Sequence, residues 1–221
     1  MGKNPETTHI PAPWALTGSG YILLFRFTHE FVRDKCRVPK ALEKSFSGGL
    51  GTVIYADYLS SDAGPYRELL FIPGTFDFSG RRYYSITRIY VSTPQSVAAG
   101  RENWGIPKEL ATFDAVRDEP GMERIRVTAQ GRLVAELKFT SMDIGLPVTS
   151  ALVPPPLRTL AHTGEDGVLL TAPKARGAVA PARTLEIRTD EELFPPVDQV
   201  RRIATVRIPH FFMVFPPAVI A

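Results

Sequence analysis

The sequence predicts a mainly β (α+β) protein, built as one mostly antiparallel sheet or barrel with a few short helices. Twenty prolines and seventeen glycines divide the 221 residues into short segments. Most of these segments are rich in the β-branched and aromatic residues that strands favour. Strands and helices do not alternate regularly, as they would in a doubly wound parallel fold. The excess of strands over helices therefore favours an antiparallel architecture.

The predicted strands are separated by turn residues along the whole chain. The pair 124–129 and 132–139 flanks Gln130-Gly131, and apolar side chains recur at every second position of 132–139. This pattern is typical of a hairpin with one face on a core. In chain order, the predicted strands are 21–27, 51–59, 67–74, 81–92, 124–129, 132–139, 167–173, 183–189 and 204–215.

Short helices are expected between some of these strands. Residues 29–36 have apolar side chains near helical spacing, and Pro39 prevents the helix from continuing. Residues 94–103 begin with Pro94, which is favoured in the first turn of a helix. Residues 194–202 add one more turn. The proline-rich stretch 151–160 is interpreted as a long connection inside a single domain that spans residues 1–221.

Composition argues against several classes of partner and cofactor. The net charge is only +3 and the basic residues are scattered, whereas nucleic-acid binding favours a concentrated basic stripe. A single cysteine, Cys36, allows neither an internal disulfide nor a thiolate metal cage. The four histidines form no chelating pair. We therefore expect no metal, no cofactor and no nucleic acid.

The chain also lacks the apolar segments that membrane insertion or export requires. No stretch approaches the roughly 18 to 20 consecutive apolar residues of a membrane span. Residues 1–14 contain no hydrophobic region of a secretory signal and do not fit a myristoylation pattern. These observations predict a cytoplasmic protein without a membrane partner.

Two segments stand out once hydrolase elbows and phosphate-binding loops are found to be missing. The first is GRENWGIPKEL at 100–110, where Lys108 follows a proline and precedes an apolar segment. A lysine there is either exposed or held in an apolar pocket, where an amine becomes a nucleophile. The second is PYRELLFIP at 65–73, where Glu68 enters an apolar strand. Glu68 is either exposed by strand alternation or buried with a partner, in which case it can serve as a general acid or base.

These two segments resemble the acetoacetate decarboxylase superfamily. GRENWGIPKEL is similar to the family's Gly-Arg-Glu followed by Pro-Lys, whose lysine forms a Schiff base. PYRELLFIP resembles the segment that carries an active-site glutamate. The resemblance implies a cone-shaped β-barrel, a homo-oligomer, and a small carbonyl substrate such as a keto acid. It also implies Lys108 as the nucleophile and Glu68 as the proton shuttle of a lyase.

Further residues are expected to bind the substrate. Trp104 and Ile106 are placed to exclude water from the lysine, and Tyr55 stands near the position of a second acidic residue in the family. The decarboxylases hold the substrate carboxylate with an arginine before the first long strand, where this chain has GSGY at 18–21. Arg26, Arg82 or Arg88 is the substitute expected from another strand.

The departures from the family pattern bear on the reaction. The decarboxylases carry a second lysine directly after the nucleophile, and Glu109 stands there in this chain. Because the groups that act on a carboxylate are the ones that differ, aldolase or dehydratase chemistry is favoured over decarboxylation of acetoacetate. The alternatives are a non-catalytic barrel that binds an apolar or aromatic ligand, and an assembly unit whose site has decayed.

Overall fold

The computed structural model describes residues 9–142 and 144–221 and contains two sheets. The N-terminal residues 1–8, considered above for export and acylation signals, lie outside the described residues. The larger sheet runs in the order β8 (Lys108–Leu110), β7 (Arg88–Val91), β4 (Tyr66–Ile72), β3 (Gly51–Ser60), β1 (Trp14–Phe25), β16 (Arg202–Phe215), β15 (Lys174–Thr189), β11 (Arg132–Ser141), β10 (Met122–Ala129) and β9 (Thr112–Glu119), with β12 (Leu146–Thr149) paired to β15.

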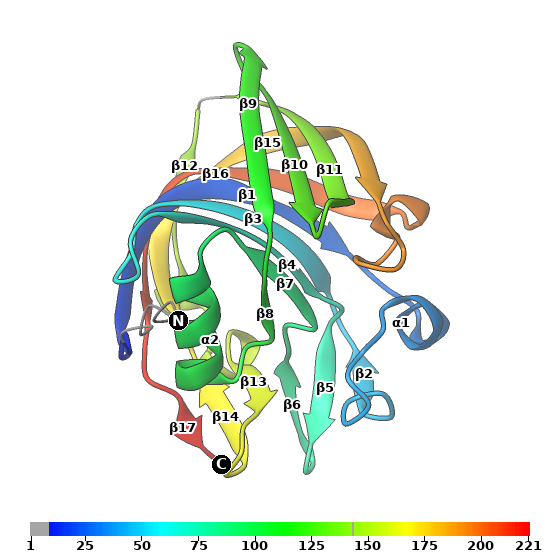
Figure 1. Ribbon diagram of the computed structural model, residues 1–221, viewed down its shortest axis with the longest axis vertical. Helices are drawn as coiled ribbons and strands as arrows, with labels where there is room; N and C mark the ends of the chain where they lie inside the picture. The colour runs from blue at the N-terminus through cyan, green and yellow to red at the C-terminus, as the bar shows by residue number, and fades with distance from the viewer. Residues whose placement is uncertain (1–8, 143) are drawn as a thin grey trace, which may run out of the picture.

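The larger sheet bends round until its two ends meet. Its terminal strands, β8 and β9, are separated in the chain by one residue, Ala111. The Ala111 N–H donates to the carbonyl oxygen of Val91 at 2.9 Å, which ties this junction to β7. Neighbouring strands pair antiparallel except β7 with β8. The result is the nearly closed, cone-like barrel that the family resemblance implies (Figure 1).

The smaller sheet and the helices cover the open side of this barrel. The smaller sheet has the order β17 (Val219–Ile220), β14 (Val168–Thr171), β13 (Leu160–Thr163), β6 (Arg81–Tyr84), β5 (Thr75–Phe78) and β2 (Phe46–Gly48). The helices are α1 (His29–Lys35) and α2 (Pro94–Trp104), with short 3₁₀ turns η1 (Ser150–Leu152), η2 (Pro155–Leu157) and η3 (Val197–Gln199).

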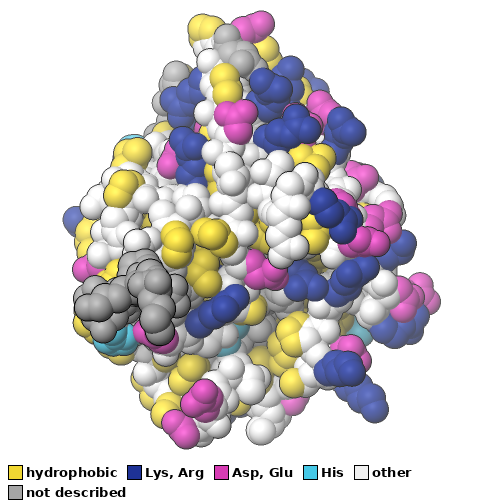
Figure 2. Space-filling model, in the orientation of Figure 1, with side chains coloured by type: hydrophobic (Ala, Val, Ile, Leu, Met, Phe, Trp, Pro, Cys, Tyr) yellow, Lys and Arg dark blue, Asp and Glu magenta, His cyan; other side chains and the backbone are white. Residues whose placement is uncertain are grey.

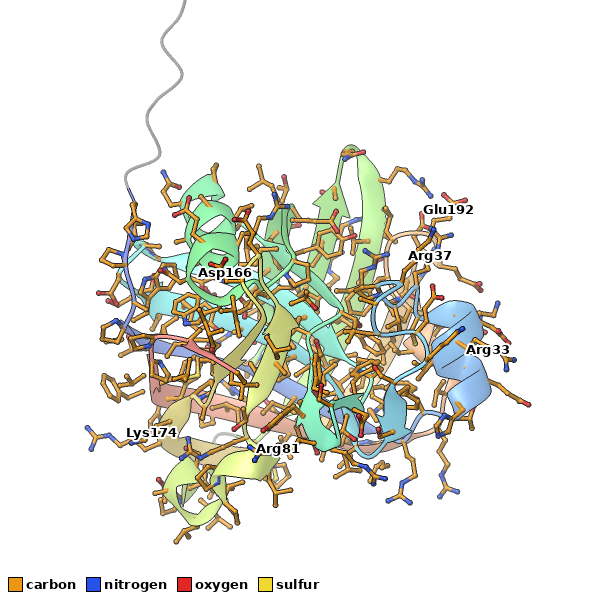
Figure 3. All side chains as sticks on the ribbon, turned by 90° about the horizontal axis from the view of Figure 1, so that it is seen from below. Arg33, Arg37, Arg81, Asp166, Lys174 and Glu192 are labelled. Carbon is orange, nitrogen blue, oxygen red and sulfur yellow. The ribbon has the colours of Figure 1, made fainter. Side chains whose placement is uncertain are left out.

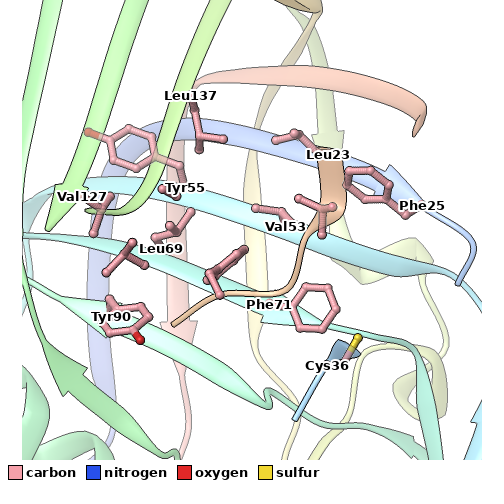
Figure 4. Packing of buried hydrophobic residues seen from close by; sticks show 14 of the residues in the cluster. Leu23, Phe25, Cys36, Val53, Tyr55, Leu69, Phe71, Tyr90, Val127 and Leu137 are labelled. Carbon is pink, nitrogen blue, oxygen red and sulfur yellow. The ribbon is translucent and has the colours of Figure 1, made fainter. Parts of the chain in front are cut away.

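Alternation along the central strands creates two separate apolar clusters. On β4, Leu69 and Phe71 belong to the first cluster, whereas Tyr66 and Leu70 belong to the second. The first cluster fills the space between the central strands and β10 and β11, and the figure shows its side chains converging (Figure 4). Cys36 is completely buried in it, and burial raises the pKa of its thiol to about 12. The second cluster lies on the opposite face of the same strands, under α2.

Most predicted elements are confirmed, and one is wrong. The hairpin β10–β11 and the helices α1 and α2 form where expected. The segment 81–92, however, is not one strand, because β6 and β7 belong to different sheets. Between them the Ile86 N–H donates to Nε2 of His162 at 3.2 Å, and the Thr87 N–H donates to the Phe71 carbonyl oxygen. These two hydrogen bonds hold the chain where it passes from the smaller sheet to the larger one.

On the face shown in Figure 2, acidic side chains lie among the basic ones, and the basic side chains form no stripe. Within residues 9–142 and 144–221, no helix has the length and hydropathy needed to cross a membrane.

The buried His162 makes stability depend on pH. Burial lowers its pKa from 6.5 to about 4. Below pH 6.5 the unfolded chain therefore binds a proton that the folded protein excludes, so stability present at neutral pH is lost as the pH falls to about 4. This group should lower the free energy of unfolding by about 3 kcal/mol over that range.

Urea unfolding at several pH values measures this effect. In His162→Gln, whose amide oxygen can still accept from Ile86, the loss of stability between neutral pH and pH 4 should be smaller than in the wild type. An equal loss in both proteins would contradict the assignment.

Candidate active site

A buried ion pair between Lys108 and Glu68 forms the centre of the candidate site. Lys108 opens β8 and Glu68 lies in β4, with β7 between the two strands. The Lys108 Nζ atom is 3.1 Å from Oε2 of Glu68. The two residues are only 3% and 5% exposed. Sequence reasoning left the exposure of both residues open, and the structure buries them together.

Polar and aromatic side chains complete the surroundings of this pair. The Lys108 Nζ donates to Oγ of Ser96 at 3.0 Å, and the Tyr58 hydroxyl donates to Oε1 of Glu68 at 3.1 Å. The Tyr66 ring centroid is 5.1 Å from Nζ and that of Trp14 is 5.9 Å away, close enough for cation–π attraction. Each charge therefore has a polar partner besides the other.

The two tyrosines beside the pair remain protonated over the physiological pH range. Burial raises the pKa of Tyr58 well above its usual range, and the charge of Glu68 raises it further. Burial and Glu68 likewise raise the pKa of Tyr66, although hydrogen bonds with Ser96 and Tyr58 act in the opposite direction. Both phenols can consequently act as hydrogen-bond donors inside the site.

The GRENWGIPKEL segment positions Lys108 through its own backbone. Helix α2 ends at Gly105, whose φ of 64° is the left-handed conformation that glycine adopts without strain. Arg101 then donates from Nε (2.9 Å) and Nη2 (2.5 Å) to the Lys108 carbonyl oxygen. Gly100 leaves room for the lysine, since a Cβ there would lie 2.5 Å from Cδ of Lys108. The helix thus fixes both the backbone and the path of the side chain.

The pair lies in a large and mostly apolar cavity of about 500 Å³. A volume of this size is typical of a site for a small organic molecule. The cavity occupies the face of the sheet that carries the second apolar cluster. Its walls include Trp14, Leu16, Ile54, Leu70, Ile89 and Phe215.

Trp104 and Ile106, both predicted to bind substrate, are buried and line this cavity. The Trp104 ring packs edge-on against Trp14 at 5.1 Å, and its Nε1 donates to the Pro216 carbonyl oxygen at 2.7 Å. Tyr55 also borders the cavity, but its side chain packs in the first cluster on the opposite face of the sheet (Figure 4).

The predicted arginines do not reach the cavity. Arg82 is exposed on β6, opposite Asp77. Arg88 Nη1 lies 3.6 Å from Oε1 of Glu109, and neither residue lines the cavity. Their neighbours Ile89 and Lys108 do line it, because successive side chains on a strand face opposite sides of the sheet. Glu109, which takes the place of the second lysine, is therefore separated from Lys108. Among the described arginines, Arg158 and Arg176 are the ones that line the cavity.

Several residues of the site were not identified from the sequence. Ser96, Tyr58, Tyr66 and Trp14 lie on different elements, and their spacing along the chain gives no common pattern. The one signal in the sequence was the place of Tyr58 in a predicted strand, whose side chains face the two sides of a sheet in turn. This pattern does not show whether a tyrosine packs in the core or faces a functional site. Among the described residues, no three His, Cys, Asp or Glu side chains gather as metal ligands.

Fold and site together define a barrel with a buried lysine and glutamate in an apolar cavity. A family model described as acetoacetate decarboxylase (ADC) matches residues 3–151, more than half of the chain. The chain therefore belongs to the acetoacetate decarboxylase family. No curated protein sequence shows significant similarity to it.

Solved structures share the fold at low sequence identity. An acetoacetate decarboxylase from Legionella pneumophila has a TM-score of 0.69 at 12% identity, covering 100% of this chain and 91% of that one. An acetoacetate decarboxylase-like enzyme from Sphingomonas wittichii RW1 has a TM-score of 0.67 at 12% identity, covering 95% and 94%. The enduracididine biosynthesis enzyme MppR in complex with pyruvate gives 0.63 at 16% identity, covering 96% and 91%. The chain thus shares the fold of these enzymes.

The contact between Gly100 and Lys108 can be tested by substitution. Helix propensity alone predicts that Gly100→Ala stabilises α2 by about 1 kcal/mol. Because the new methyl group would collide with the lysine chain, we expect destabilisation instead, by roughly 1–3 kcal/mol. Urea unfolding measures the difference.

The same substitution in a Lys108→Ala background is the control. With the lysine chain removed, Gly100→Ala should stabilise the protein, because only the helix propensity remains. A stabilising effect of Gly100→Ala in the wild-type background would contradict the proposed contact.

Proposed function

We propose that this protein is a Schiff-base-forming lyase that acts on a keto acid or related carbonyl compound, with Lys108 as the nucleophile and Glu68 as the proton shuttle. The observation that carries the proposal is the 3.1 Å contact between these two side chains in an apolar cavity. Family membership supports it, since the family's lysine has the same place after Gly-Arg-Glu and proline.

The geometry supports a proton transfer that prepares the amine. When Glu68 takes a proton from Lys108, two buried charges become two neutral groups, which an apolar environment tolerates better. The free amine then attacks the carbonyl carbon, and a C–N bond forms. The protonated Glu68 returns its proton to the carbonyl oxygen, which becomes a hydroxyl group. Glu68 then takes one proton from the nitrogen and passes it to this hydroxyl, so that the C–O bond breaks and water leaves. The iminium that remains accepts electrons from the bond cleaved next.

The residues around the pair favour aldolase or dehydratase chemistry over decarboxylation. Decarboxylation needs a group that holds the substrate carboxylate near the amine. Arg88 is instead paired with Glu109 away from the cavity, and Arg82 is exposed. The two arginines that line the cavity are engaged elsewhere, Arg158 with backbone carbonyl oxygens and Arg176 with the Phe212 ring. The Tyr58 hydroxyl donates to Glu68, and the Tyr66 phenol adds a neutral group that suits a carbonyl or hydroxyl oxygen.

The alternative is a barrel that binds an apolar or aromatic ligand without catalysis. The apolar lining of the cavity favours it, because such a surface attracts an apolar molecule whether or not Lys108 reacts. The two functions differ in one respect, which is the covalent bond to the lysine.

Reductive trapping tests this bond. Incubation with cyanoborohydride and either the 3-oxo acid acetoacetate, pyruvate or another 2-oxo acid should add the mass of the reduced adduct to Lys108, as measured by intact and peptide mass spectrometry. Lys108→Met should remain unmodified. Glu68→Gln should be trapped about 10²- to 10⁴-fold more slowly, which is the usual contribution of a positioned acid or base.

The exposed Lys174 provides a matched control. Its side chain extends from the edge of the molecule (Figure 3), so Lys174→Met should be trapped like the wild type. An unmodified wild-type protein across the whole panel would overturn the proposal. Equal labelling of Lys108→Met would also overturn it.

A further inference from the structure

We infer that the substrate is a ketone-like carbonyl compound with one small substituent and one long apolar substituent, the long one lying along the sheet away from Lys108. This inference rests on the proposed function and specifies the substrate class of the same site. It follows from three features of the cavity: its crowded inner end, its apolar floor and its open outer end.

The inner end has little space around the amine. The Tyr66 and Trp14 rings lie 5.1 Å and 5.9 Å from Lys108 Nζ, and Gly100 has no room for even one more methyl group against the lysine chain. The lining residues Leu16 and Ile106 are almost fully buried there. A carbonyl carbon bound to Nζ can therefore direct only a small group toward this end.

A row of cavity residues leads away from the pair. Glu68 pairs with Ala56 across β3, Ala56 with Gly20 on β1, and Gly20 with Ile208 on β16. All four residues line the cavity. Three steps between neighbouring strands correspond to about 14 Å along the curved sheet. Ala56 and Gly20 add at most one methyl group to the middle of this row, so no large side chain of the row stands between Glu68 and Ile208. At Gly20 the backbone of β3 takes the place of a side chain, since a Cβ there would lie 2.1 Å from the Tyr55 carbonyl oxygen.

The far end of the cavity is open and remains apolar. Ile208 and Val179 are half-buried cavity residues, and Val148 on β12 is 45% exposed. Phe211 belongs instead to the inner part, because its ring packs against that of Tyr58 at 5.7 Å. The cavity thus changes from closed at Lys108 to accessible at β12 and β16. A long apolar substituent can enter from this side and remove the exposed lining from water, which is favourable in proportion to the area covered.

The charged groups of the cavity fit the same orientation. Arg158 is bonded to the carbonyl oxygens of Val153, Ala172 and Pro173, and Arg176 stacks over the Phe212 ring at 5.3 Å. Both belong to the outer side of the cavity, together with β12 and β15. Between them and the Lys108–Glu68 pair, the row from Ala56 to Ile208 presents no charged side chain.

A series of 2-alkanones tests the inference by cyanoborohydride trapping on Lys108 in the full chain. The half-saturating concentration should fall about tenfold for every two methylenes added from 2-pentanone to 2-heptanone and 2-nonanone. The isomers 2-heptanone and 4-heptanone contain the same atoms, but 4-heptanone has no small substituent. It should be trapped at least about tenfold less well, since its second propyl group must enter the inner end.

Two substitutions on one strand locate the long substituent. Ile208→Trp fills the outer part of the row and should raise the half-saturating concentration of 2-nonanone about tenfold or more relative to that of acetone. Ile203→Trp places the same side chain on β16 at a position that is 55% exposed and does not line the cavity. It should leave both ketones unaffected.

The outcomes separate this inference from the proposed function. If acetone, pyruvate and every alkanone fail to modify Lys108, both are overturned. If Lys108 is trapped equally well by acetone and 2-nonanone, or by 2-heptanone and 4-heptanone, the Schiff base stands and the substrate class is wrong. The comparison of isomers uses the wild-type protein, so it decides the question even if Ile208→Trp does not fold.

Discussion

The structure depends on burying one positive and one negative charge together in an apolar cavity. An unpaired Lys108 or Glu68 at this depth would cost several kcal/mol, so each residue requires the other. The pair also links β8 to β4 across β7 and brings Ser96 of α2 into the same network. Arg101 and Gly100 then hold the lysine backbone and leave space for its side chain. The bond from the Ala111 N–H to the Val91 carbonyl oxygen ties the chain that leaves β8 to β7, next to this network.

The neutral phenols give the pair its chemical character. A nearby cation would compete with Lys108 for Glu68, and a further carboxylate would need its own partner. Tyr58 and Tyr66 add donors without adding charge, because burial keeps both protonated. The proton transfer proposed above from Lys108 to Glu68 therefore leaves the net charge of the site unchanged. This property matters in a cavity whose apolar walls solvate an unbalanced charge poorly.

The sequence identified the two residues of the buried ion pair and the local elements, but not the rest of the site. Lys108 and Glu68 lie in short patterned segments, and α1, α2 and the β10–β11 hairpin follow from local signals. The split between β6 and β7 depends on a bond from Ile86 to His162, 76 residues away, which no local pattern records. For the same reason Arg82 and Arg88 were assigned to the cavity without knowledge of which side of the sheet they face. The sequence around Tyr58 and Tyr66 does not distinguish them from tyrosines that pack in a core.

The central strands separate two functions by alternation. Leu69 and Phe71 stabilise the barrel from one face of β4, and Glu68 and Leu70 form the cavity on the other. A substitution at a cavity position therefore leaves the packing of the first cluster largely intact. Relatives that diverged from such a sheet could exchange one substrate for another through successive cavity mutations without first losing the ability to fold. The solved structures fit that freedom, since they share the fold of this chain at only 12–17% identity to it.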